Sequence, residues 1–512
     1  MESIDIDVDA LLATLPARFS EIPARIAAHD PQHVVLIEDE RRLDAAAFVW
    51  AIDTTALQLS QAGVQGGDRV MIVGENSVAQ VVLMFAAAKL DAWALLTNAR
   101  LSASEIDAIR DHAKPRVVAF TVEASKDAAI HAERLNAQPA ESSIGAWHRV
   151  IDETVSPEPV EADPARQCGA LIYTTGTTGA PKGVMLSHRN LLFIAAISST
   201  LRHVTPTDVV YAVLPISHVY GLASVCLGSL YAGATLRLAS RFTPHAVLHA
   251  LEQENVSIFQ GVPAMHAKLV EHVQTSGTPW HAPALRFAYS GGSPLDAALK
   301  SRVEAMYKVP LHNGYGMTES SPTISQTMLD APRDDCAAGD PIPGIELRFV
   351  ALEGGDVPTG EVGELWVRGP NVMLGYYRNE AQTRAVVTED RWLRTGDLAR
   401  LAADGALHIV GRSKELIIRS GFNVYPAEVE NVLNSHPDVL QSAVIGRPVE
   451  GNEEVIAFVE LLPSVHTLPA DLDAWCAARL APYKRPAEIR VLAALPAAST
   501  GKVLKHKLRD AL

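Results

Sequence analysis

Short apolar runs alternate with helix-like segments over most of this 512-residue chain, and the alternation limits the fold more than any other feature. Four such runs precede turn or helix signals and are predicted to be buried strands: residues 68–76, 115–120, 209–215 and 257–263. Strands that alternate with helices are typical of parallel sheets whose two faces are covered by helices. We therefore predict an α/β fold with stacked sheets.

The pattern of apolar segments changes toward the C-terminus. From about Gly344 the β-like segments become shorter, as in ELRFVA and GELWVRG, which predicts a β-rich subdomain. After Gly411 the pattern indicates a strand, a glycine turn, a helix opened by Pro426 and another strand. Because 512 residues exceed what one hydrophobic core organises, we expect a large N-terminal domain over residues 1–411 and a small α+β domain over residues 412–512.

The composition narrows the functions that need to be considered. The formal net charge of −15 argues against a nucleic-acid partner, which would require basic patches. Lys89 and Asp91 interrupt the longest apolar stretch, Val81–Leu96, which therefore predicts a buried helix and no integral membrane segment. The N-terminus lacks the order of a signal peptide and the four cysteines lie far apart, which favours a cytoplasmic protein with reduced thiols.

One loop is suited to holding phosphate. Between Tyr173 and Val184 the sequence contains four threonines, three glycines and one lysine, Lys182. Glycines let backbone N–H groups approach an anion, hydroxyls donate hydrogen bonds and the lysine adds positive charge. The loop does not match a Walker A motif, because Pro181 precedes the lysine and Gly183 follows it. Taken alone, the segment also fits a surface turn without a ligand.

Six motifs in order resemble those of the acyl-adenylate-forming superfamily, which includes acyl-CoA synthetases, adenylation domains of peptide synthetases and firefly luciferase. The match covers nearly the whole chain. The motifs are YTTGTTGAPKGV (Tyr173–Val184), NGYGMTE (Asn313–Glu319), GELWVRGPNVMLGYY (Gly363–Tyr377), WLRTGDL (Trp392–Leu398), GRSKELIIRSGFNVYPAEVE (Gly411–Glu430) and STGKVLKHKLR (Ser499–Arg509).

The resemblance implies ATP, Mg²⁺ and coenzyme A as ligands, with a role for each matching residue. A carboxylate attacks the α-phosphate of ATP, so catalysis must position two anions and neutralise their charge. Glu319 is expected to hold Mg²⁺, a hard cation that prefers oxygen ligands. The other implied nucleotide contacts are Thr174, Thr175, Gly176, Thr177, Thr178, Gly179 and Lys182 for the β- and γ-phosphates, Thr318 for the α-phosphate, Asn313, Tyr315 and Gly316 around the adenine, and Asp397 with Arg412 for the ribose.

The C-terminal domain of such enzymes rotates between two half-reactions. By resemblance Lys502 is the adenylation lysine, and its charge offsets the repulsion between the carboxylate and the α-phosphate. The hinge corresponds to Lys414, and Gly421 leaves room for the pantetheine tunnel in the thiol step. The neighbouring Lys505, with other basic residues, looks like part of a solvated helix face.

The acyl pocket is implied to lie between four segments: Pro215–Leu222, Gln260–His266, Tyr289–Leu295 (which includes Gly292) and residues around Gly316–Pro322. His218 matches a position that flanks the carboxylate in acyl- and aryl-CoA synthetases. An amino-acid substrate is disfavoured, because the segment SHVYGL lacks the aspartate that holds an α-amino group. The segments also show no extra arginine or lysine for a diacid, so an apolar aromatic or fatty acid is expected.

These expectations describe an AMP-forming acid–CoA ligase that works in two steps through an acyl-adenylate, with a small carboxylic acid and coenzyme A as partners. An adenylating enzyme that loads a carrier-protein thiol remains an alternative, as do a luciferase-like oxygenase and a non-catalytic sensor. The sensor is disfavoured, because the motif residues Lys182, Glu319, Asp397 and Lys502 are present. The sequence does not determine the oligomeric state, and a homodimer is one option.

Overall fold

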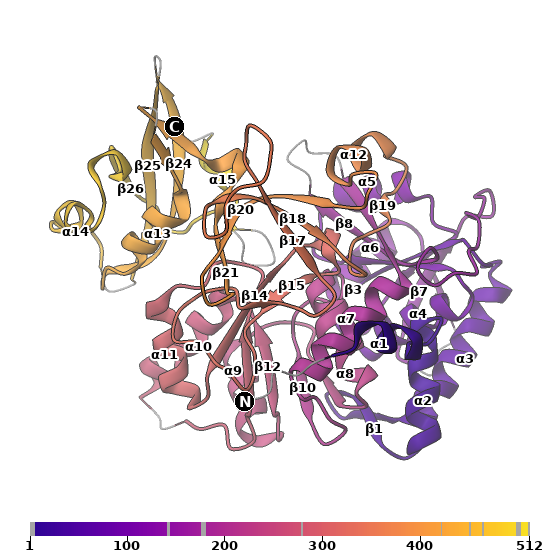
Figure 1. Cartoon of the computed structure of the whole chain (residues 1–512). Helices are drawn as coiled ribbons and strands as arrows, with labels where there is room; N and C mark the ends of the chain where they lie inside the picture. Colours follow the sequence, from indigo (N-terminus) through magenta and orange to yellow (C-terminus); the bar gives the residue numbers. More distant parts are fainter. Residues whose placement is uncertain are drawn as a thin grey trace.

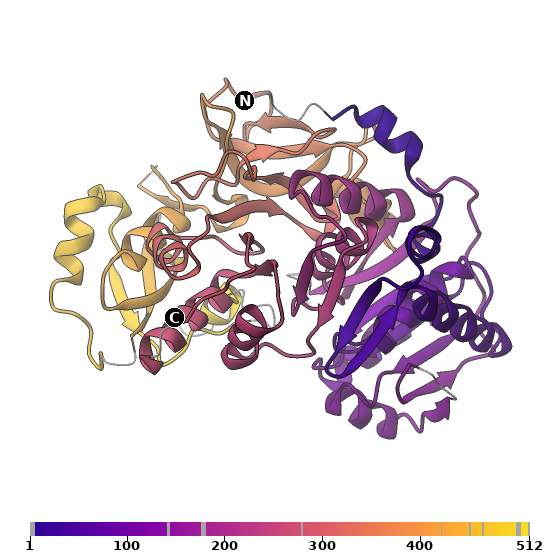
Figure 2. The same cartoon turned by 90° about the horizontal axis from the view of Figure 1, so that it is seen from below.

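The computed structural model describes residues 6–140, 144–175, 181–277, 280–420, 422–449, 452–462, 465–497 and 503–509. Two large sheets, a smaller antiparallel sheet and a C-terminal group of elements make up the molecule (Figure 1). Figure 2 shows the C-terminal elements at the opposite end of the molecule from α3 (Ala45–Gln61) and the other N-terminal helices. The expected α/β class with a separate β-rich part is confirmed.

The first large sheet has nine strands. Its central strands run parallel, and antiparallel strands close both edges. In spatial order the strands are β16 (Asp340–Pro341), β15 (Thr323–Gln326), β14 (Leu311–Gly316), β13 (Phe287–Ser290), β12 (Ile258–Gly261), β10 (Val209–Ala212), β11 (Thr235–Leu238), β1 (Val34–Glu38) and β2 (Arg41–Asp44).

The second large sheet has eight strands, and its centre is again parallel, from β8 through β4 and β3 to β5. Its order is β19 (Gly375–Tyr376), β9 (Pro181–Ser187), β8 (Cys168–Thr175), β4 (Trp93–Asn98), β3 (Arg69–Gly74), β5 (Val117–Phe120), β7 (Trp147–Ile151) and β6 (Gln138–Ala140). The four apolar runs predicted as strands coincide with β3, β5, β10 and β12.

Helices occupy three layers around these sheets. One continuous hydrophobic core joins the facing sides of the two sheets through α3, α4 (Val78–Lys89), α7 (His188–Leu201) and η2, a π-helix at Tyr220–Leu227. Separate cores lie on the outer faces, under α5 (Ala103–Ala113) and α6 (Lys126–Arg134) on one side and under α9 (Pro244–Gln253), α10 (Pro263–Ser276) and α11 (Ala297–Tyr307) on the other. Helix α4, which lies deepest in this core, is therefore buried along nearly its whole length, whereas α3 keeps one face exposed to solvent.

The apolar stretch Val81–Leu96 divides between α4 and β4, with a turn near Asp91, instead of forming one long helix. No helix among the described residues combines the length and apolar character that a membrane crossing requires.

The β-rich subdomain is a four-stranded antiparallel sheet of β17 (Glu346–Val350), β18 (Gly363–Arg368), β20 (Leu393–Leu401) and β21 (Leu407–Arg412). Beyond it, a separate core holds β22 (Ile417–Arg419), β23 (Phe422–Val424), α13 (Pro426–Asn434), β24 (Val439–Val449), β25 (Asn452–Leu461), α14 (Leu472–Arg479) and β26 (Glu488–Val491). The chain passes from β21 to this core through a short 3₁₀ turn, Ser413–Glu415. The predicted boundary at residue 411 falls within β21, and the hinge at Lys414 stays a prediction.

Candidate active site

A buried carboxylate at the small sheet is held by two partners. Asp397 on β20 and Arg412 on β21 are opposite one another in the antiparallel register, and the Arg412 Nε lies 3.1 Å from the Asp397 Oδ1. The hydroxyl of Tyr315, near the end of β14, donates to the other carboxylate oxygen. These contacts bring together three of the residues predicted from separate motifs, and they fix the orientation of the carboxylate.

Tyr315 acts as a neutral donor in this cluster. Burial, followed by the negative charge of Asp397, raises the pKa of Tyr315 well above its usual value. A phenol that keeps its proton donates to the carboxylate at any physiological pH.

Asn313 presents one defined hydrogen-bonding group. It lies on β14, two residues before Tyr315, and its amide Nδ2 donates to the backbone carbonyls of Cys336 and Ala337 at 3.2 and 3.3 Å. Those bonds orient the amide so that Oδ1 is the atom suited to accept from a ligand amine. This chemistry fits the role predicted for Asn313 beside the adenine, whose exocyclic amine is a hydrogen-bond donor.

A tyrosine connects the phosphate loop to the predicted metal ligand. The Tyr376 hydroxyl donates to the Glu319 Oε1 at 2.8 Å, and the ammonium of Lys182 lies 5.5 Å from the centre of the Tyr376 ring. Strand β19, which carries Tyr376, pairs antiparallel with β9, which carries Lys182. This tyrosine lies within the GELWVRGPNVMLGYY motif, but the family resemblance predicted no role for it.

The described residues contain no group of three or more histidine, cysteine, aspartate or glutamate side chains that could enclose a metal ion. This is compatible with Mg²⁺, which is commonly bound through one or two carboxylates together with waters and substrate phosphates. Glu319, half-buried beside Thr318, is a suitable single carboxylate for a magnesium ion that arrives with a nucleotide.

The structure describes only part of the predicted phosphate loop. Thr174 on β8 lies opposite Lys182 on β9, and Thr175, opposite Pro181, ends β8. The remaining predicted loop residues, Gly176, Thr177, Thr178 and Gly179, lie outside the described residues. The strand pairing places both arms of the loop at one end of the eight-stranded sheet, next to Tyr376.

The segment after β14 is compact and sterically demanding. Thr318 is buried at the start of a 3₁₀ turn, Thr318–Ser320. A Cβ added at Gly316 would lie 1.9 Å from the carbonyl oxygen of Pro322, so no larger residue fits without moving the backbone. Gly292 lies in the exposed turn after β13 with a φ of +80°.

His218 lies two residues before the start of the π-helix η2. Its Nδ1 accepts a hydrogen bond from the backbone N–H of Tyr220 at 3.3 Å, and its side chain is half-buried. Short π-helical segments are found frequently at functional sites, because the extra residue per turn redirects neighbouring side chains. The turn from Pro215 into η2 thus positions both His218 and Tyr220.

Some residues predicted to act from the C-terminal domain lie outside the described residues. Lys502 and Gly421 lie outside the described residues, and Lys414 is exposed in the turn between β21 and β22. Lys505 differs from expectation: its ammonium lies 2.7 Å from Glu430 and 3.1 Å from Glu415. Burial lowers its pKa, but the two carboxylates outweigh this effect and the net pKa is raised. The prediction of a solvated face was wrong for this residue, because the helical pattern does not reveal acidic partners on other elements.

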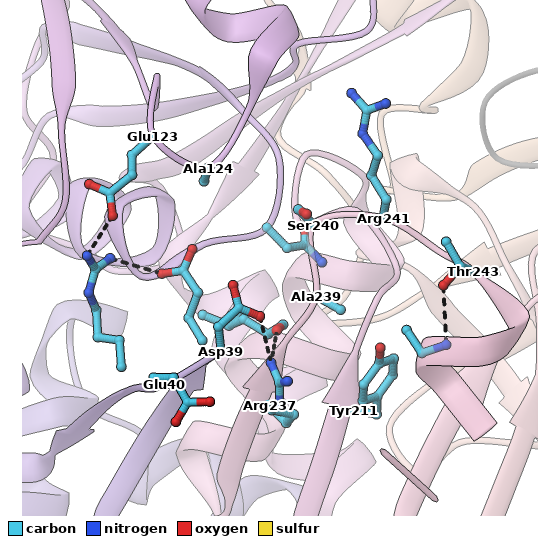
Figure 3. A pocket seen from close by; sticks show the side chains of 15 residues that line it. Asp39, Glu40, Glu123, Ala124, Tyr211, Arg237, Ala239, Ser240, Arg241 and Thr243 are labelled. Atoms are coloured by element: carbon cyan, nitrogen blue, oxygen red, sulfur yellow. Dashed lines mark hydrogen bonds and ion pairs between the residues drawn. The ribbon is translucent and has the colours of Figure 1, made fainter. Parts of the chain in front are cut away.

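A cavity of about 560 Å³ lies apart from all the predicted residues, near the ends of β1 and β11. Figure 3 shows Arg237 beside Asp39 on its wall. Arg237 also pairs with Glu254 at 2.6 Å, and Arg241 pairs with Glu75 at 3.0 Å and with Asp127 at 2.5 Å. Each of these arginines is therefore paired with carboxylates of the same chain.

Comparisons with known proteins identify the family of the chain. The family model of the AMP-binding enzymes matches residues 24–377, and that of the AMP-binding enzyme C-terminal domain matches residues 428–502. A feruloyl-CoA synthase of Amycolatopsis is 35% identical over 492 residues, which cover 95% of this chain and 97% of the relative. An indoleacetate–CoA ligase of Aromatoleum aromaticum is 32% identical over 500 residues, covering 96% and 97%.

Solved structures give the same result. The o-succinylbenzoate coenzyme A synthetase of Bacillus subtilis, in complex with ATP and magnesium ion, matches with a TM-score of 0.80 and 29% identity. The match covers 96% of this chain and 99% of that one. The chain therefore belongs to the family of AMP-binding enzymes.

Proposed function

We propose that this enzyme joins an aromatic carboxylic acid to coenzyme A in two steps. In the first step a carboxylate oxygen attacks the α-phosphorus of ATP, and pyrophosphate leaves. In the second step the thiolate of coenzyme A attacks the carbonyl carbon of the acyl-adenylate, and AMP leaves with the bonding electrons. Family membership and relatives that are named as CoA ligases of aromatic acids support this reaction.

The contact that carries the proposal is the link through Tyr376 between Lys182 and Glu319. It joins a cation suited to terminal phosphates with a carboxylate suited to magnesium, so that both can act on one triphosphate. Asp397, held by Tyr315 and Arg412, is proposed to accept hydrogen bonds from ribose hydroxyls. Thr318 is proposed to bond the α-phosphate.

Lys502 is proposed to supply the positive charge for the first step only. Lys502→Ala should lower acid-dependent ATP–pyrophosphate exchange by about 10³-fold, because the repulsion between two anions is no longer offset. The same variant should still make thioester from a supplied acyl-adenylate. Lys507→Ala, an exposed lysine on the same segment, is the matched control and should keep both activities. Equal loss of both half-reactions in Lys502→Ala would remove this assignment.

The whole reaction is tested by product analysis across a panel of aromatic and fatty acids with ATP and Mg²⁺. AMP and pyrophosphate are expected, with thioester only when coenzyme A is added. Formation of ADP would overturn the proposal. Thioester on an acyl-carrier protein but not on coenzyme A would favour the carrier-loading alternative. The cytoplasmic location and the homodimer stay predictions.

A further inference from the structure

One buried arginine has too few partners. Arg202 directly follows α7, and 1% of its surface is exposed. Its two terminal nitrogens donate to the side-chain carbonyls of Gln260 on β12 and Gln326 on β15, at 2.9 and 3.1 Å (Figure 1 places these elements). Its Nε is buried without a hydrogen-bond partner in the described part of the chain. A guanidinium carries five N–H donors, so this one is under-satisfied.

The other buried arginines are satisfied differently. Arg69 donates four hydrogen bonds to backbone carbonyls, between 2.8 and 3.1 Å. Arg116 pairs with Asp68 at 3.3 Å. Arg202 forms no ion pair with any described residue, although burial of a charge without a counter-ion is strongly unfavourable. The chain thus keeps a cation where its own residues do not neutralise it.

A second unpartnered group lies close to the same guanidinium. The guanidinium lies 4.8 Å from the ring centre of Tyr289, and that ring is 6.1 Å from the ring of Tyr220. The hydroxyl of Tyr220 is buried and has no hydrogen-bond partner among the described atoms. Native proteins rarely leave buried polar groups of this kind unpartnered unless a ligand or water completes them.

These groups belong to the expected walls of the acyl pocket. Tyr220 lies in the segment 215–222, Gln260 begins the segment 260–266 and Tyr289 begins the segment 289–295. Arg202 bonds Gln260 and lies against the ring of Tyr289, which is next to Tyr220, although it follows α7 and is outside every wall segment. Arg202 therefore adds to these segments a positive charge that their own residues lack.

We propose that Arg202 recognises an oxygen acceptor on the acid, at the end remote from the reacting carboxylate, with Tyr220 as a second contact. The inference rests on the proposed function and names its substrate class: acids that carry a phenolic or carboxylate oxygen at their far end. Such an oxygen completes the guanidinium through a charge-assisted hydrogen bond. A site built for this bond discriminates by large factors against an analogue that lacks the oxygen.

The test uses matched acids that differ only at the far position. Benzoic, phenylacetic and 3-phenylpropenoic acids, each with hydrogen, hydroxyl or carboxyl at the para position, are compared by kcat/KM for AMP formation with ATP and coenzyme A. In at least one series an oxygenated acid should exceed its parent by about 10²-fold. The hydroxyl and carboxyl arms separate a phenol from a second carboxylate as the preferred group.

Two variants assign that preference to Arg202. Arg202→Met should bring the ratio of oxygenated acid to parent close to one, because the rate with the oxygenated acid falls. Gln326→Glu keeps the shape of its side chain but supplies the missing counter-ion, and it should lower the same ratio, most strongly for the carboxyl arm. Arg384→Met, at an exposed arginine on α12 (Glu380–Val386), is the control and should retain the wild-type ratio.

The results of these measurements can contradict either the inference about Arg202 or the proposed function. A ratio near one for every reacting series in the wild type, or an undiminished ratio in Arg202→Met, would overturn the inference. If Arg202→Met does not fold, Gln326→Glu decides by the same ratio. An enzyme that forms no AMP with any acid would instead refute the proposed function, so the two failures are distinguishable.

Discussion

The proposed nucleotide end and the proposed acyl end of the candidate site differ in whether a buried charge has an oppositely charged partner. At the nucleotide end, the carboxylate of Asp397 has a cation, Arg412, and a neutral donor, Tyr315, supplied by the chain itself. At the acyl end, the guanidinium of Arg202 bonds two neutral amide oxygens and lies against the rings of Phe287 and Tyr289. No carboxylate among the described residues pairs with it.

This difference indicates which group each end expects from its ligand. A charge that the chain already balances can be held rigidly for neutral contacts such as ribose hydroxyls. A charge that the chain leaves unbalanced has most to gain from a ligand that supplies the missing partner. The same principle distinguishes Arg202 from the paired arginines of the cavity in Figure 3.

The largest effect is expected at Glu319. Glu319→Gln keeps the shape of the side chain but removes the negative charge proposed to hold magnesium, and ATP–pyrophosphate exchange should fall by about 10³-fold. The magnesium concentration needed for half-maximal rate should rise as well. Tyr376→Phe, which removes only the hydrogen bond to Glu319, should show a smaller change in the same direction. An unchanged magnesium dependence in Glu319→Gln would contradict the metal role.

The paired charge at the nucleotide end is tested through Asp397. Asp397→Asn leaves Arg412 without its carboxylate and presents an amide to the Tyr315 hydroxyl, so kcat/KM for ATP should fall by about 10²-fold. The preference among acids should stay as in the wild type, since the acyl end is untouched. A change in acid preference equal to the loss for ATP would show that the two ends are not separate.

Sequence motifs could name the residues of the proposed nucleotide end because these residues come in contiguous strings. Asn313, Tyr315, Thr318 and Glu319 lie within one motif, where β14 ends and turns, so neighbours in sequence are neighbours in space. The alternation of strands and helices likewise predicted β3, β5, β10 and β12, because fully buried parallel strands are continuous apolar runs. What the motifs left out was Tyr376, whose role appears only through the pairing of β19 with β9.

The acyl end was not predictable in the same way. Arg202, Gln260, Tyr289 and Gln326 lie on four different elements, and each taken alone is an ordinary surface or core residue. The segments expected to form the acyl walls contain no arginine, whereas Arg202, which follows α7, contacts Gln260 in one of them. Lys505 was misjudged for the same reason, because its partners Glu415 and Glu430 are distant in sequence.

Two substitutions compare how a paired and an unpaired buried cation contribute to the free energy of unfolding. Lys505→Met leaves the two carboxylates of Glu415 and Glu430 close together without a cation, and the C-terminal domain should lose about 2 to 3 kcal/mol. Arg202→Met removes an unbalanced charge but also leaves Gln260 and Gln326 without a donor, so these effects offset and stability should change by less than about 1 kcal/mol. Hydrogen exchange in β24 and β25, and in β12 and β15, measures each locally. A larger loss in Arg202→Met than in Lys505→Met would mean that Arg202 is held mainly for stability.

The smallest effect concerns a histidine beside Arg202. Burial, together with the positive charges of Lys300 and Arg202 and against Glu304, lowers the pKa of His312 to about 4. The ring stacks on Phe287 and bonds the Thr327 hydroxyl at 3.1 Å. An unfolded histidine titrates near 6.5, so between about pH 6.5 and pH 4 the unfolded chain binds a proton that the folded chain excludes. Stability therefore decreases as the pH falls through this window.

Arg202→Met removes one of the cations that disfavour protonated His312, so its pKa should rise and the loss of stability between pH 7 and pH 5 should shrink by less than about 1 kcal/mol. Urea unfolding at the two pH values measures the difference. The buried His188 and His266, whose pKa values burial lowers to about 3 and about 4, contribute equally to both proteins and cancel. His312→Gln should abolish the difference between the two backgrounds. If the difference persists without His312, the charge of Arg202 is felt elsewhere, and the acyl end contains a titrating partner other than this histidine.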